Sequence, residues 1–410
     1  MSSSGTAASA QPAKKVRRAY IHVGAPKTGT TFLQGVLWQN RRSLRDAGLH
    51  IVGNGPGDHY RAGHDIREVP YDPADPRPDW KGSWDVLCSL AVASEADAVI
   101  ISDEHLASLT PEQVERAVKA LHPREVHVVY ASRNLARLVP SEYQEYVKHR
   151  SKLTYAEWTA KVFNRRDRGP GRWFWSVHDP VGVVDRWTTA VPPERFHLMT
   201  LPLPGSPRDE LWMRFCAVVD IDPMAAIEFD VAKNDSLGMA EAEVLRRVNN
   251  VLPEDFPRWH HSGIARDVLA VQILGPRSKS GRPGLPKPLQ RKVLQQTEEN
   301  IQKLSASGCH VVGDLAELEV GDELSAADPQ PNTEEVLDAA IDGLAGLLVR
   351  MGHMRDDRRE AEGRLRRQMR ESASMTRTRT RVAARLERTR WGAQALSKYR
   401  DYRSRSAGTP

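Results

Sequence analysis

The fold is decided by the stretch Tyr20-Ile-His-Val-Gly24-Ala-Pro26-Lys27-Thr28-Gly29-Thr30-Thr31-Phe-Leu-Gln34. A run of β-forming residues leads to Gly24, a loop framed by Gly24 and Gly29 follows, and an apolar-periodic helix begins at Thr30. This strand–loop–helix order is typical of loops that hold a phosphate group with backbone N–H groups and the first turn of a helix. We therefore expect the loop to bind an anion.

The position of the lysine distinguishes this loop from the ATP-binding type. In the Walker form, lysine directly follows the second glycine and grips the β- and γ-phosphates beside Mg²⁺. Here Thr30 follows Gly29, and the lysine, Lys27, lies inside the loop. The pattern disfavours ATP hydrolysis, and a nucleotide-dependent kinase or other phosphotransferase on the same fold is kept as an alternative.

Strand and helix signals alternate along the first half of the chain. The pattern predicts strands over 19–23, 50–52, 98–102, 126–132 and 196–200, separated by helices that include 30–46, 83–94 and 136–149. Such alternation implies an α/β fold of the P-loop type, with a mostly parallel sheet flanked by helices. Residues 53–82 are rich in Gly, Pro and Asp and are interpreted as a long irregular loop. Later helices are predicted over 208–219, 236–251, 260–273 and 287–305.

The chain divides into four predicted segments. These are a disordered leader (1–17), the α/β domain (18–319), an acidic linker with two prolines (320–333) and a helical basic tail (334–410). Within the tail, residues 350–405 hold 17 Arg and one Lys against seven acidic residues, a net charge of +11. Because the whole chain carries +6, its basic character resides in the tail.

Several partners of the tail stay open. It interleaves few aromatic residues with its arginines, which disfavours nucleic acid. A solvated extension, an anionic membrane surface, a polyanionic acceptor and a partner helix are the alternatives. The three scattered cysteines and the absence of a long apolar run indicate a cytoplasmic protein, with the inner face of the membrane as a peripheral location. No Cys or His spacing indicates a metal site.

Two motifs together resemble a known family. The loop 24–33 is similar to the 5′-phosphosulfate loop of sulfotransferases that use 3′-phosphoadenosine 5′-phosphosulfate (PAPS). Downstream, Val128-Val-Tyr-Ala-Ser-Arg133-Asn134 ends a strand, and Ser141 follows eight residues after Arg133. In that family, such an arginine and serine hold the 3′-phosphate of the donor, a role that suits the guanidinium fork and the hydroxyl group.

A third segment resembles the heparan-type branch of the family. Ser278-Lys279-Ser-Gly-Arg282-Pro283 is similar to a late Lys-Gly-Arg loop that closes over the donor phosphates. The resemblance implies that Lys279 and Arg282 bind phosphate. A serine interrupts the run here, and the cysteine pair that flanks the loop in relatives is missing.

The resemblance also implies roles in catalysis. The donor would be held by the loop residues Gly24, Pro26, Lys27, Thr28, Gly29, Thr30 and Thr31, with no metal required. Lys27 would stabilise the charge that develops on the oxygen between phosphate and sulfate. Glu104 follows the apolar strand 98–102, at the sheet edge where open α/β folds bind ligands, and is the expected general base. His105 is the alternative base, because cytosolic relatives use a histidine from this region.

The acceptor is less defined by the sequence. His64, Trp173 and His178 are candidate acceptor contacts, since aromatic faces suit sugar rings, although such residues also serve as solvated loop histidines or core aromatics. The resemblance favours a hydroxyl group on a carbohydrate or glycolipid. We therefore predict a PAPS-dependent sulfotransferase. A further alternative is a non-catalytic scaffold that acts through its basic tail.

Overall fold

The computed structural model describes residues 16–73, 77–231, 236–277, 280–281, 284–321, 331–387, 394 and 398. Residues 1–15 of the expected leader and 322–330 of the expected linker lie outside this part of the chain. Lys279 and Arg282, the expected late phosphate ligands, also lie outside it. The chain divides into two compact units, residues 1–343 and 344–410.

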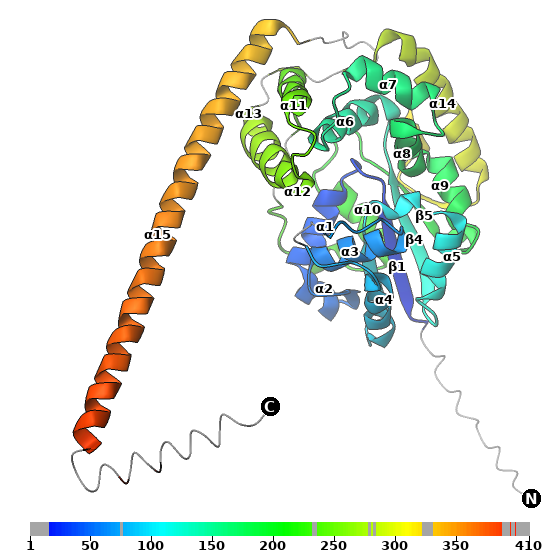
Figure 1. Ribbon diagram of the computed structural model, residues 1–410. Helices are drawn as coiled ribbons and strands as arrows, with labels where there is room; N and C mark the ends of the chain where they lie inside the picture. Colours follow the sequence, from blue (N-terminus) through cyan, green and yellow to red (C-terminus); the bar gives the residue numbers. More distant parts are fainter. Residues whose placement is uncertain are drawn as a thin grey trace, which may run out of the picture. The chain divides into compact units, whose positions relative to one another are not determined.

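The described strands form one six-stranded sheet at the centre of the first unit (Figure 1). They are β1 (Arg18–Gly24), β2 (Leu49–Ile51), β3 (Ala98–Ser102), β4 (Glu125–Ser132), β5 (Phe196–Thr200) and β6 (His310–Val312). Their order in the sheet is β2-β3-β1-β4-β5-β6, and every neighbouring pair is parallel. The predicted α/β fold is confirmed. The short strand β6 was not predicted.

Helices connect the strands and account for most of the remaining described chain. The α-helices of the first unit are α1 (Thr30–Gln39), α2 (Arg41–Asp46), α3 (Pro56–Ile66), α4 (Ser83–Ala93), α5 (Pro111–Lys119), α6 (Leu135–Lys148), α7 (Tyr155–Asn164), α8 (Gly169–His178), α9 (Pro180–Trp187), α10 (Glu210–Val219), α11 (Met239–Val251), α12 (Arg258–His260), α13 (Gly275–Arg277) and α14 (Lys287–Ala306). Short 3-10 helices occupy Leu106–Ser108, Pro193–Arg195, Pro223–Ala225 and Leu315–Leu318, and a π-helix occupies His261–Leu274.

Both faces of the sheet are covered, because successive residues of a strand point to opposite sides. Along β1, Ala19 and Ile21 belong to one buried cluster and Tyr20 belongs to another. Trp84 of α4 lies in the first cluster, and Trp212 of α10 lies in the second. The sheet is therefore the middle layer, and its loops are free to build a site only at the strand ends.

Asn40 interrupts the helix that was predicted over 30–46. Its side-chain amide donates to the carbonyl oxygens of Val36 (2.8 Å) and Glu228 (2.7 Å), and its Oδ1 accepts from the backbone N–H of Ile227 (2.8 Å). These bonds tie the end of α1 to a distant segment, and α2 begins afresh at the next residue. An asparagine side chain competes in this way with the backbone of a helix.

The interpretation of 53–82 as an irregular loop was wrong for residues 56–66, which form α3. Pro56 occupies the first turn, where its missing N–H costs nothing. The buried positions 59, 62, 63 and 66 follow helical spacing and face the interior. The Gly- and Asp-rich composition conceals this amphipathic pattern.

A long helix, α15 (Thr333–Glu387), begins where the helical tail was predicted. In the first unit its residues Val336 and Ala339 are buried. In the second unit, apolar side chains such as Leu344, Leu348 and Met351 are exposed. No helix in the described part of the chain is both long enough and apolar enough to cross a membrane.

Candidate functional site

The loop between β1 and α1 turns sharply at three residues. Gly24 (φ 110°), Lys27 (φ 62°) and Gly29 (φ 86°) adopt left-handed backbone conformations. Such φ angles suit glycine, whereas a lysine pays a steric cost and is held there by its surroundings. The Thr28 hydroxyl donates to the carbonyl oxygen of Ala25 (2.6 Å) and closes the loop on itself. The local sequence thus produces a compact, sharply turned loop between β1 and α1.

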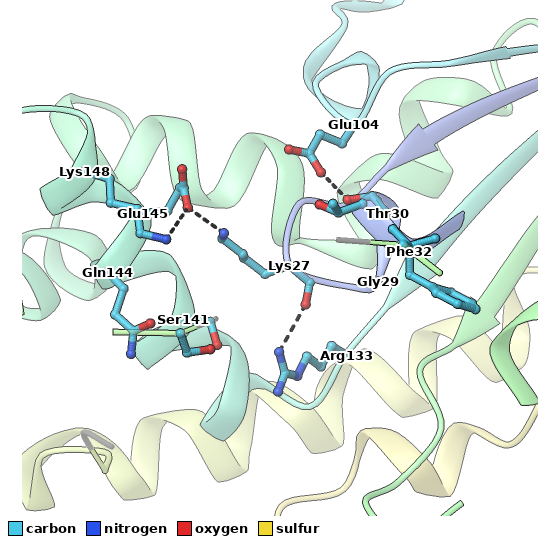
Figure 2. A pocket seen from close by; sticks show the side chains of 13 residues that line it. Lys27, Gly29, Thr30, Phe32, Glu104, Arg133, Ser141, Gln144, Glu145 and Lys148 are labelled. Carbon is cyan, nitrogen blue, oxygen red and sulfur yellow. Dashed lines mark hydrogen bonds and ion pairs between the residues drawn. The ribbon is translucent and has the colours of Figure 1, made fainter. Parts of the chain in front are cut away.

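A cavity of about 400 Å³ opens over this loop (Figure 2). It is lined by Lys27, Gly29, Thr30, Thr31, Phe32, Glu104, Arg133, Ser141, Gln144, Glu145, Lys148, Val231 and Ser236. The structure therefore brings six of the expected donor-binding residues to one cavity, namely Lys27, Gly29, Thr30, Thr31, Arg133 and Ser141. Gly24, Pro26 and Thr28 are buried in the body of the loop.

Lys27 forms an ion pair that the sequence does not predict. Its Nζ lies 2.5 Å from Oε2 of Glu145 on α6, and 22% of its side chain is exposed. Burial opposes the charge of Lys27, but the Glu145 carboxylate outweighs it and raises the pKa of Lys27. The lysine is consequently protonated at neutral pH. Its carbonyl oxygen accepts a hydrogen bond from Arg133 Nη1 (3.1 Å).

Arg133 and Ser141 are positioned by the end of β4 and the start of α6. The helix begins after Asn134, whose Oδ1 accepts from the backbone N–H of Ala136 (2.8 Å). Ser141 lies in the second turn, where its hydroxyl donates to the carbonyl oxygen of Arg137 (3.0 Å). In Figure 2 the two side chains lie on the same side of the cavity. The spacing of eight residues therefore places a guanidinium group and a hydroxyl group beside one space.

Glu104 lies at the carboxyl end of β3 and faces the loop. Its Oε2 accepts a hydrogen bond from the Thr30 hydroxyl, so the first residue of α1 holds the carboxylate at the cavity (Figure 2). The backbone of Glu104 also packs against Gly24, the last residue of β1. Glu104 is thus the expected base that lines the cavity.

His105, the alternative base, does not line the cavity. Its Nδ1 lies 3.1 Å from Oδ1 of Asp103, which also accepts from the His105 backbone N–H (2.8 Å). Burial lowers the pKa of His105, but the Asp103 carboxylate outweighs this and raises it above its ordinary value. A raised pKa leaves less of the imidazole in the neutral form that can accept a proton at a given pH.

Two of the three expected acceptor contacts lie near His105. The ring of His64 on α3 is 6.5 Å from that of His105, and the Trp173 ring on α8 is 5.6 Å from it. The Arg67 guanidinium lies over Trp173, 5.2 Å from the ring centre. His64, Arg67 and Trp173 thus form a polar and aromatic group around His105, the residue that follows Glu104, although none of them lines the cavity.

His178, the third expected acceptor contact, lies in the interior. Its side chain is fully buried, and its ring packs 4.9 Å from that of Phe174. Nε2 lies 3.1 Å from Oε1 of Glu142, but the angles are not those of a hydrogen bond, and neither ring nitrogen has a hydrogen-bond partner among the described residues. The surrounding aromatic run of α8 builds core at this point.

Sequence reasoning missed three polar residues that line the cavity from α6. Gln144, Glu145 and Lys148 follow Ser141 by three, four and seven positions, so they lie on one face of the helix. This spacing was a usable signal once Ser141 had been assigned to the site. Among the described residues, no three His, Cys, Asp or Glu side chains are grouped to hold a metal ion.

Replacing Gly24 by alanine should disrupt both the loop and the position of Glu104. A Cβ at this residue would lie 2.5 Å from the Glu104 carbonyl oxygen, and the φ of 110° disfavours any side chain. We expect a loss of about 1–3 kcal/mol in the free energy of unfolding, together with loss of anion binding at the loop. Thermal melts and calorimetric titrations measure both effects.

Gly55→Ala is the matched control for this substitution. Gly55 has extended backbone (φ −174°), and an added Cβ would meet no atom within 4 Å. The melting temperature and anion affinity of the Gly55→Ala protein should equal those of the wild-type protein. A Gly24→Ala protein that melts and binds like Gly55→Ala would contradict the close approach of the two backbones.

Comparisons with known proteins found weak structural similarity to two sulfotransferases. No family model matches the sequence, and no curated protein matches it. A sulfotransferase from Alicyclobacillus acidocaldarius is similar in structure, with a TM-score of 0.37, 16% identity, and coverage of 53% of this chain and 87% of that one. A sulfotransferase domain from the curacin biosynthetic pathway is similar with a TM-score of 0.28, 13% identity, and coverage of 70% and 97%. At such scores the likeness carries no argument about activity.

Proposed function

We propose that the protein is a PAPS-dependent sulfotransferase that moves a sulfuryl group to an acceptor hydroxyl. One observation carries the proposal. A loop with an internal lysine shares a single cavity with Arg133 and Ser141, and Glu104 lines the same cavity. A loop that binds a single phosphate group does not require a second cationic residue such as Arg133 in the same cavity.

The side chains of the cavity suit a ligand with several negative charges. Lys27 and Arg133 provide positive charge at two places on the wall, whereas Lys148 is buried beside the Glu145 carboxylate. The Thr31 hydroxyl on the wall adds a hydrogen-bond donor, and the first turn of α1 presents N–H groups without partners in the helix. Charge-assisted hydrogen bonds of this kind are the strong ones in phosphate recognition.

The roles of the residues follow from their positions. PAPS supplies the sulfuryl group when it is bound. Lys27 carries a positive charge in a partly buried site, where it stabilises negative charge developing on the departing phosphate. Glu104 accepts the proton that the acceptor hydroxyl loses as its oxygen bonds to sulfur. We assign the base to Glu104 because it lines the cavity and His105 does not.

We further propose a carbohydrate or glycolipid acceptor that is contacted by His64 and Trp173. The support is their proximity to His105, next to the proposed base in the chain. Aromatic and imidazole rings offer flat faces to sugar rings. His178 is left out of this set because its side chain is buried.

Calorimetric titration with adenosine 3′,5′-bisphosphate, the product that PAPS leaves, tests the proposal. We expect binding without added metal, and weaker binding of adenosine 5′-monophosphate because that nucleotide lacks the 3′-phosphate for Arg133 and Ser141. Arg133→Met should remove most of the difference between the two nucleotides.

The contrary result is equally specific. If the wild-type protein binds ATP with Mg²⁺ but not the bisphosphate, the protein is a phosphotransferase and the proposal fails. Equal affinity for the two adenosine nucleotides would remove the roles of Arg133 and Ser141.

A further inference from the structure

Glu145 is shared by two lysines at the wall of the cavity (Figure 2). Its Oε2 lies 2.5 Å from Lys27 Nζ and 3.8 Å from Lys148 Nζ. Its other oxygen, Oε1, lies 3.3 Å from Nε2 of His149, whose side chain is 57% exposed. One carboxylate oxygen thus serves two ammonium groups, and Lys27 occupies the closer position.

Lys148 is the less satisfied of the two lysines. Only 4% of its side chain is exposed, and no shorter ion pair of its ammonium is found in the described part of the chain. Burial lowers the pKa of Lys148, and the distant Glu145 carboxylate compensates only in part. A buried charge is costly without a close partner, so Lys148 gains if Glu145 becomes available.

Lys27, in contrast, has a close partner that it must leave in order to act. Its ammonium pairs with Glu145 of α6, but its proposed role requires it at an anion held by the loop. Breaking a partly buried ion pair leaves an uncompensated charge and is unfavourable unless another partner takes over. A cation already 3.8 Å from the same oxygen is such a partner.

We propose that Glu145 and Lys148 are positioning residues that exchange ion-pair partners when an anion binds. Glu145 holds Lys27 through the ion pair described above, and an anion at the loop draws Lys27 away. Glu145 then closes on Lys148, so neither the carboxylate nor the buried ammonium stays unpaired. The identity of the anion as a PAPS-type nucleotide rests on the proposed function, whereas the exchange itself rests on the three side chains.

Titration with adenosine 3′,5′-bisphosphate should show opposite changes in affinity for variants at positions 145 and 148. Glu145→Gln should tighten binding by about 10-fold, because no ion pair must be broken to release Lys27. Lys148→Met should weaken binding by about 10-fold, because Glu145 loses its second partner. Lys148→Arg should restore most of the affinity, since a guanidinium group can pair with the same carboxylate. Thermal melts of each variant verify that it is folded.

The double variant separates exchange from simple charge attraction. With Glu145→Gln in place, Lys148→Met should change affinity by less than about 2-fold, because no carboxylate then needs a second partner. If Lys148→Met weakens binding equally in both backgrounds, Lys148 attracts the anion directly and the exchange is wrong. Lys161→Met, at an exposed position of α7, is the control for loss of one positive charge.

A second probe keeps this test independent of the nucleotide. The same variants are titrated with inorganic phosphate, which needs only the loop and Lys27. The variants can show coupling between positions 145 and 148 with phosphate while the protein does not bind the bisphosphate. That result would retain the exchange and reject the proposed donor. Binding of bisphosphate without any coupling would reject the exchange and retain the donor.

Discussion

Replacing Lys27 by methionine should lower the rate of sulfuryl transfer by about 10²–10³-fold, the usual cost of removing one group that stabilises developing charge. The reason is the position of the ammonium group, which lines the cavity at the loop and is kept charged by Glu145. Methionine keeps most of the aliphatic stem, so the local packing is preserved. Initial rates with saturating PAPS and a sugar acceptor panel measure the effect.

The fold should tolerate the Lys27 substitution. Glu145 keeps Lys148 and His149 as neighbours, so the carboxylate is not left alone. The melting temperature should therefore stay near that of the wild-type protein. Lys161→Met, with its side chain exposed on α7, controls for the loss of a lysine and should transfer at the wild-type rate. Undiminished transfer by the Lys27 variant would remove the lysine from the mechanism.

Replacing Glu104 by glutamine should lower kcat by about 10²–10⁴-fold, the range expected for loss of a general base. Glutamine has nearly the same shape and its amide oxygen can still accept from the Thr30 hydroxyl, so the loop should keep its position. The change removes the proton-accepting carboxylate and little else. Steady-state rates, with bisphosphate affinity as a check on the donor site, measure the outcome.

His105→Asn is the companion variant that decides between the two bases. Asp103 raises the pKa of His105 against the effect of burial, which makes the ring a weaker candidate for accepting a proton than an ordinary histidine at the same pH. We expect His105→Asn to reduce kcat far less than Glu104→Gln. If the order of the two effects is reversed, His105 is the base and Glu104 has a role in holding Thr30.

The fold was readable from the sequence wherever the signal was local. The strands around β1, β3, β4 and β5 are short runs of β-branched and aliphatic residues that end in polar loops, and each lies where it was predicted. The start of α5 is defined just as locally, because the Thr110 side chain forms a capping box with Gln113. Such signals depend on neighbours within a few positions.

The errors in the fold have a common cause. Asn40 ends a helix by hydrogen bonds to Ile227 and Glu228, which lie 187 and 188 positions further along the chain. No local sequence pattern predicts these bonds. The short strand β6 gains its structure by pairing with β5, and its three residues carry little signal alone. The helix α3 was missed because its Gly- and Asp-rich sequence has weak helix propensity. It forms because one of its faces is buried.

For the site, the sequence by itself determined the tight loop between β1 and α1, because its glycines and its lysine act within six residues of one another. It also predicted that Arg133 would end a strand, that Ser141 would follow eight residues later in the next helix, and that Glu104 would follow an apolar strand. Only the tertiary structure decided which distant charges meet. Lys27 and Glu145 are 118 positions apart, and they pair because β1 and β4 are neighbours in the sheet and carry the loop and α6 to the same edge. The same packing buries His178 and places Lys148 beside the Glu145 carboxylate, which is already paired with Lys27. Burial and the distances between charges depend on the fold as a whole.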